Sequence, residues 1–184
     1  MSKTVITFAT ILILHGGGST SNFPELNPDL EMYQDIPKGF PLTETWYMLY
    51  RNYEEDPNFG TSKCVRFSQV GPEEEGGYHI LIEYGEEPQS ANALFTLAST
   101  EGYTSKNQLN FVPEGQEDSL PLYLSFMDVG KCTVYRSIYV KEDACTVVAP
   151  KSQLGQSTTC DFVYDLLCGP KKYQTSDASC QNED

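Results

Sequence analysis

Between residues 45 and 149, short apolar or alternating runs are separated by turn residues such as Asp56-Pro57-Asn58 and Gly71-Pro72. Leu120, Leu122, Leu124 and Phe126 occupy alternate positions, so this run should present one strongly apolar face. Consecutive strands at this spacing predict an up-and-down barrel or a sandwich. The eight strands predicted are Thr45–Tyr53, Cys64–Val70, Gly77–Tyr84, Ala93–Ser99, Gln108–Val112, Leu120–Met127, Cys132–Val140 and Ala144–Ala149.

Helical patterns lie at the two ends of this region. Asn27 followed by Pro28 indicates a helix start, and the chain should leave the helix before Pro37. Thr158 and Asp161 have the spacing of a capping box, and Gly169-Pro170 ends the run that follows. We therefore expect a short N-terminal helix and a C-terminal helix packed outside the strands. The apolar face of the second helix should comprise Phe162, Val163, Leu166 and Leu167.

Residues 1–21 have the pattern of a secretory signal peptide. Lys3 is followed by the apolar run Val5–Leu14 and by a stretch of small residues, Gly16–Ser21. The alternative is a membrane anchor, but the run is about half of the ~20 residues that span a bilayer. We expect cleavage after residue 21, leaving residues 22–184 as one secreted domain without membrane insertion.

Charge and histidine content exclude several classes of function. The chain has 12 Lys and Arg against 26 Asp and Glu, a net charge of −14, which disfavours binding to nucleic acid or an anionic membrane. Only two histidines occur, and His15 lies in the predicted signal peptide, which leaves His79. One histidine cannot build the usual catalytic zinc sites, so we expect neither an enzyme nor a metal or other cofactor.

Six cysteines fit an oxidising compartment and predict three disulfides, for which the sequence allows 15 connectivities. No two cysteines have the Cys-x-x-Cys spacing of a metal site. The cysteines are Cys64, Cys132, Cys145, Cys160, Cys168 and Cys180.

The segment from Trp46 to Cys64, WYMLYRNYEEDPNFGTSKC, resembles the first strand and following loop of tick salivary lipocalins, the histamine-binding-protein group. Gly102-Tyr103 and the later cysteines agree with that family in order and approximate spacing. The resemblance implies an eight-stranded antiparallel up-and-down lipocalin barrel, secreted in saliva, which we expect to be a monomer. It also implies the disulfides Cys64–Cys180 and Cys132–Cys160, and we pair the remaining Cys145 with Cys168.

Amine-binding members of this family hold their ligand with internal carboxylates and aromatic rings, and this chain keeps only part of that pattern. Tyr53 and Asp56 match it, Phe59 stands where a tryptophan is found, and two glutamate positions align near Ala93 and Val147. A buried amine without a counter-charge is costly, so we expect an apolar pocket instead. Its predicted lining is Ala93, Leu94, Leu97, Leu109, Phe111, Leu122, Leu124, Phe126 and Val147.

Such a lining suits a sterol or another lipid. The loss of carboxylates and the added cysteine pair resemble the japanin group of this family, salivary immunomodulators that act on host dendritic cells and carry cholesterol. We therefore expect a small hydrophobic ligand and a host immune-cell receptor. The alternative is a scavenger of histamine or serotonin. Asp56 could equally be a turn residue, while Tyr53, Phe59 and Phe111 could simply fill the barrel, and Trp46 is expected to plug its base.

No Asn-x-Ser/Thr acceptor occurs, but Gln156-Ser157-Thr158 and Gln174-Thr175-Ser176 would be acceptors if the glutamines were asparagines. We interpret Gln156 and Gln174 as replacements of two glycosylated asparagines. The alternative is that both glutamines are native.

Overall fold

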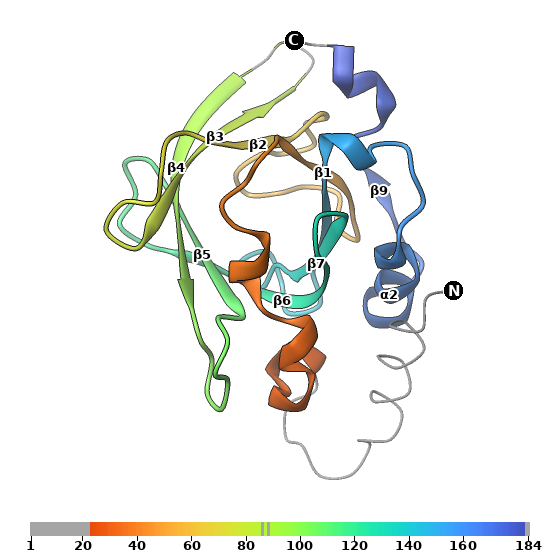
Figure 1. Cartoon of the computed structure of the whole chain (residues 1–184). Helices are drawn as coiled ribbons and strands as arrows, with labels where there is room; N and C mark the ends of the chain where they lie inside the picture. The colour runs from red at the N-terminus through yellow and green to blue at the C-terminus, as the bar shows by residue number, and fades with distance from the viewer. Residues whose placement is uncertain (1–22, 86, 88, 183–184) are drawn as a thin grey trace.

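The computed structural model describes residues 23–85, 87 and 89–182, and the predicted signal peptide lies outside them. Eight antiparallel strands form a closed barrel in sequence order (Figure 1). This confirms the predicted barrel. The strands are β1 (Trp46–Arg51), β2 (Arg66–Gln69), β3 (Gly77–Tyr84), β4 (Gln89–Ala98), β5 (Gln108–Pro113), β6 (Leu120–Asp128), β7 (Cys132–Arg136) and β8 (Cys145–Pro150).

Strand β1 closes the barrel because it pairs with β8 along its length and with β2 at its start. The short strand β9 (Tyr173–Gln174) pairs with the end of β1, where β2 no longer reaches. The Cys64–Cys180 disulfide ties the segment after β9 to the chain just before β2. The sequence did not predict β9, since a two-residue strand has no periodicity.

The N-terminal segment forms three 3₁₀ turns, η1 (Pro24–Leu26), η2 (Pro28–Tyr33) and η3 (Ile36–Gly39), instead of the single helix predicted. A proline near the start of each turn removes a backbone donor and favours short segments. Pro37 therefore begins η3 and does not end a helix. The segment runs along β6 and then contributes Ile36 and Phe40 to the barrel interior.

Helix α2 (Thr159–Cys168) packs outside the barrel against β6, β7 and β8, as predicted (Figure 1). The Asp161 carboxylate accepts a hydrogen bond from the Thr158 backbone N–H at 2.7 Å, which confirms part of the predicted cap. The 3₁₀ turns η4 (Lys151–Gln153) and η5 (Ala178–Asn182) flank this C-terminal region.

Two disulfides hold α2 against the barrel. Cys132–Cys160 lies near the helix start and Cys145–Cys168 at its end, so all three disulfides have the expected pairing. The prediction for the apolar face was partly wrong, because Phe162 and Leu166 are 41% and 49% exposed. Val163 is buried and Leu167 packs against the same cluster, as predicted. Cys160 and Tyr164 complete the buried face, since the disulfides at Cys160 and Cys168 hold this side of the helix toward the barrel.

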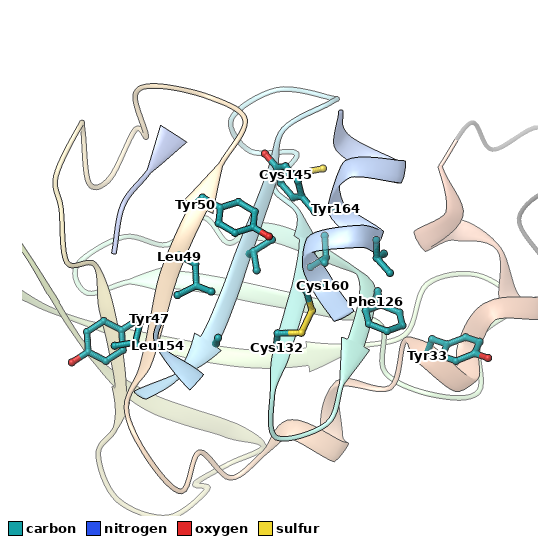
Figure 2. Packing of buried hydrophobic residues seen from close by; sticks show 14 of the residues in the cluster. Tyr33, Tyr47, Leu49, Tyr50, Phe126, Cys132, Cys145, Leu154, Cys160 and Tyr164 are labelled. Carbon is teal, nitrogen blue, oxygen red and sulfur yellow. A yellow bond between two sulfur atoms is a disulfide. The ribbon is translucent and has the colours of Figure 1, made fainter. Parts of the chain in front are cut away.

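Two hydrophobic clusters lie on opposite sides of the barrel wall. The inner cluster lies inside the barrel and includes Ile80, Phe95 and Leu124. The outer cluster lies between the barrel wall and α2, where Figure 2 shows Tyr50, Phe126 and Tyr164 around the Cys132–Cys160 disulfide. The disulfides thus lie with the outer cluster, outside the barrel interior that holds the cavity.

Candidate ligand-binding cavity

The barrel contains a cavity lined by β1, β2 and β4 to β8, by the loop residues Phe59 and Tyr139, and by the segment before β1. The cavity volume is about 80 Å³, and the wider space of about 750 Å³ includes open solvent at its mouth. Its lining residues are Gly39, Phe40, Leu42, Trp46, Met48, Phe59, Phe67, Phe95, Leu109, Phe111, Leu122, Met127, Thr133, Tyr135, Tyr139, Thr146 and Val148.

One wall of the cavity is a closed cycle of four phenylalanine rings. Phe59 lies 6.2 Å from Phe111 and 6.3 Å from Phe67 between ring centroids. Phe95 completes the cycle at 5.7 Å from Phe111 and 6.3 Å from Phe67. Such rings offer flat apolar faces to a ligand and support one another through tilted and edge contacts.

Four of the residues predicted to bind ligand line the cavity: Phe59, Leu109, Phe111 and Leu122. Ala93, Leu97 and Leu124 belong to or pack against the inner cluster but do not line the cavity. Leu94 has the opposite orientation, since it pairs with the exposed His79 on the outer face of β3.

Phe126 and Val147 belong to the outer cluster, which corrects their predicted position. In β6 the register with β7 shifts between Leu124 and Phe126, so an extra residue reverses the alternation of side chains. Met127 therefore faces the cavity in place of Phe126. On β8 the inward positions are Thr146 and Val148, so Val147 points outward into the outer cluster.

The predicted residues Tyr53 and Asp56 lie behind the cavity wall, in a buried polar network. Asp56 forms an ion pair with Arg51, at 3.7 Å between Nη1 and Oδ2, and both side chains are at most 1% exposed. Tyr139, which lines the cavity, donates a hydrogen bond to Asp56 Oδ2 at 2.8 Å. Tyr53 donates to the same oxygen at 3.2 Å. Asp56 also has a turn role, accepting from the Asn58 backbone N–H at 2.8 Å.

Arg51 is the partner that sequence reasoning missed. Its guanidinium also donates to the backbone carbonyls of Glu54 and Gly60, so it organises the loop after β1 around Asp56. One feature of the sequence indicated this role: Arg51 is a charged residue in an apolar strand, five residues before Asp56.

Several cavity residues were also missed, including Phe67, Phe95 and Tyr135. Alternation from Leu97, two residues further along the same strand, could have identified Phe95. Trp46, expected at the barrel base, lines the cavity.

No acidic or basic side chain lines the cavity within the described part of the chain. Its polar groups are hydroxyls of threonine and tyrosine and the Trp46 indole. Burial, together with the nearby Asp56 charge, raises the pKa of Tyr53 to about 12. Among residues 23–85, 87 and 89–182, no group of three or more side chains could hold a metal ion. No helix in these ranges is long and apolar enough to cross a membrane.

Structural comparison finds similar barrels in other proteins, among them the following three. The AM182 serotonin complex has a TM-score of 0.55 and 17% identity, covering 74% of this chain and 84% of that one. Japanin from Rhipicephalus appendiculatus bound to cholesterol has a TM-score of 0.52 and 10% identity, covering 85% and 97%. Insecticyanin from the tobacco hornworm Manduca sexta has a TM-score of 0.56 and 14% identity, covering 90% and 91%.

No curated protein sequence matches the chain. The model of the tick histamine binding protein family matches residues 24–182, which covers most of the chain and confirms the resemblance drawn from the Trp46–Cys64 segment. The matched region contains the complete barrel, α2 and the three disulfides. The chain therefore belongs to the tick histamine-binding-protein family.

Proposed function

We propose that the protein is a secreted carrier that holds a small neutral hydrophobic ligand, a sterol or another lipid, in its barrel. The supporting observation is that no charged side chain lines the cavity within the described residues. The nearby charge of Asp56 is already balanced by Arg51. A buried ammonium would therefore lack a counter-charge, whereas a sterol ring system would find the phenylalanine wall.

Binding of an amine such as serotonin or histamine is the second candidate. It is favoured by the buried Asp56, which lies one tyrosine ring behind the cavity wall. An ammonium could reach the carboxylate only if Tyr139 moved and the Arg51 pair opened. We therefore place amine binding second.

We test the carrier function with Trp46, which is the only tryptophan in the chain and lines the cavity. Titration with the fluorescent sterol dehydroergosterol should give saturable energy transfer from Trp46 at one sterol per protein. Histamine and serotonin should not displace it. Saturable displacement by either amine, or no sterol transfer, would contradict the proposal.

A matched pair of variants localises the ligand. Val148→Phe adds a ring at a cavity position on β8, whereas Val112→Phe adds the same ring outside the cavity lining on β5. Val148→Phe should weaken sterol binding about tenfold or more, while Val112→Phe should leave it unchanged. Circular dichroism melting of both variants checks folding, because overpacking itself costs about 1–3 kcal/mol.

We further propose that residues 1–21 are removed on secretion and that the mature protein modulates host dendritic cells through a surface receptor. Three disulfides fit an extracellular protein, and the resemblance to the japanin group supports the cellular target. N-terminal sequencing of secreted protein should start at residue 22. Maturation of dendritic cells in its presence should be altered, and unchanged surface markers would reject the cellular role.

Gln156 and Gln174 are both exposed, so a glycan at either position would reach solvent. This supports, as a proposal, the replacement of two glycosylated asparagines. A native gene that encodes glutamine at both positions would reject it.

A further inference from the structure

A continuous chain of hydrogen bonds connects the cavity wall to Asp56. Ser137 Oγ lies 3.0 Å from Thr146 Oγ1, which lies 2.8 Å from the Tyr53 hydroxyl. Tyr53 then contacts Asp56 Oδ2 at 3.2 Å, and Tyr139 contacts the same oxygen at 2.8 Å. Thr146 and Tyr139 line the cavity, while Ser137 and Asp56 are buried behind it.

The carboxylate sets the direction of every hydrogen bond in this chain. An ionised carboxylate only accepts, and a tyrosine hydroxyl has a single hydrogen, so Tyr53 and Tyr139 each donate theirs to Asp56. Tyr53 must then accept from Thr146, and Thr146 in turn must accept from Ser137. The two hydroxyls of this chain that lie on the cavity wall, Tyr139 and Thr146, therefore have no hydrogen left to donate to a ligand.

Both tyrosines keep their protons at neutral pH, as this order requires. Burial, followed by the neighbouring Tyr53 and Asp56, raises the pKa of Tyr139 well above its ordinary value. Tyr53 is shifted in the same direction. Arg51 balances the Asp56 charge, so the chain presents oriented oxygen lone pairs to the cavity without a net negative charge.

We infer that this end of the cavity selects a ligand that donates a hydrogen bond, namely a neutral alcohol, over the corresponding ketone or carboxylate. A ligand hydroxyl can donate to Tyr139 or Thr146. A carbonyl oxygen has no hydrogen to donate, so its lone pairs would face the lone pairs of these two hydroxyls. A carboxylate would add repulsion to the same mismatch. The inference rests on the proposed function and specifies its ligand class.

The other polar groups of the cavity do not reverse this preference. The hydroxyls of Thr133 and Tyr135 make no hydrogen bond with described residues and can rotate to donate or accept. They can serve an alcohol as well as a ketone. The Trp46 indole N–H only donates, and it can pair with the oxygen of either ligand. The Asp56 chain only accepts at the cavity wall, so it is what distinguishes the alcohol from the ketone.

The test uses 5α-cholestan-3β-ol and 5α-cholestan-3-one, which share a ring skeleton and differ only in the oxygen function at carbon 3. Competition of each against dehydroergosterol gives their relative affinities. We expect the wild-type protein to bind the alcohol about tenfold more tightly than the ketone, since the ketone leaves a buried acceptor without a donor. The pair 1-hexadecanol and hexadecanoate should show the same order.

Three variants test the residues. Thr146→Val removes one cavity acceptor and Tyr139→Phe removes the other, and each should reduce the alcohol preference by about threefold or more. Thr133→Val makes the same threonine substitution on the neighbouring strand β7, outside the Asp56 chain, and should retain the full preference. Circular dichroism shows that each variant is folded, and binding of the ketone, which has no hydrogen to donate to the two acceptors, shows that its cavity is intact.

The outcomes separate this inference from the proposed function. If wild-type protein binds alcohol and ketone equally, the carrier function stands and the inference is wrong. A preference that survives both Thr146→Val and Tyr139→Phe would also overturn it. If neither the sterols nor the alkyl chains bind, the proposed function itself fails and the inference fails with it.

Discussion

Replacing Arg136 with methionine should destabilise the protein by about 3–5 kcal/mol, because it leaves the Glu25 carboxylate buried without its partner. Arg136 Nε donates to Glu25 Oε1, and the two side chains are 3% and 0% exposed. Methionine keeps most of the apolar stem of arginine, so the lost charge dominates the change in stability. Urea unfolding of wild-type and variant protein measures the difference.

The effect should extend to the whole N-terminal segment, since Glu25 is its buried anchor. The Glu25 backbone carbonyl accepts from Tyr103 and Asn107, and its carboxylate also accepts from Ser125. Gln34 joins the same network by donating to the carbonyls of Pro24 and Ser125. The segment therefore depends on polar contacts with β6, β7 and the loop before β5.

Two further variants serve as controls for the ion pair. Lys131→Met removes a charge from the exposed pair with Asp128 and should change stability by no more than about 1 kcal/mol. Combining Arg136→Met with Glu25→Leu removes both buried charges and should recover part of the loss. An Arg136→Met variant as stable as wild type would contradict this role of the ion pair. So would a double variant whose loss of stability exceeds the summed losses of Arg136→Met and Glu25→Leu.

Removal of the Cys64–Cys180 disulfide by paired alanine substitution should cost about 4–5 kcal/mol, because it closes a loop of 116 residues. The loop contains nearly the whole barrel, from the start of β2 through α2. The unfolded chain gains correspondingly more freedom without the bond. Thermal and urea unfolding under non-reducing conditions measure the loss.

The Cys145–Cys168 disulfide provides the comparison, since its sequence separation is only 23 residues. The chain-entropy relation then gives about 3 kcal/mol for its removal. Both half-cystines of each pair become alanine, so the chemical change is matched. Equal losses, or a larger loss for the shorter loop, would show that local packing and not loop closure determines the stabilisation.

The barrel could be predicted from sequence because each strand carries its own signal. Gly77–Tyr84 was predicted with the observed bounds, as turn residues bracket a clear alternation. The inward orientation of β6 could not be followed past Leu124, because one extra residue in the bulge reverses the pattern. The bulge is stabilised by distant groups, since Gln34 hydrogen-bonds the Ser125 carbonyl.

The candidate site was predictable only where local motif and alternation agree. Leu109 and Phe111 lie on a regular strand and line the cavity as expected. The Asp56 network was not predictable, because it joins residues from the loop after β1 to Tyr139 and Thr146, more than 80 positions away. Contacts of that range depend on the closed barrel and leave no periodic pattern.

The most direct measurement is native mass spectrometry, with organic extraction, of the protein purified from a eukaryotic host, followed by calorimetric titration with histamine and serotonin. We predict one co-purified neutral lipid or sterol per protein, released by extraction, and no binding heat with either amine. An empty barrel that binds histamine or serotonin with sub-micromolar affinity would contradict the proposed carrier function. In that case, the Asp56 carboxylate would have to be reachable from the cavity.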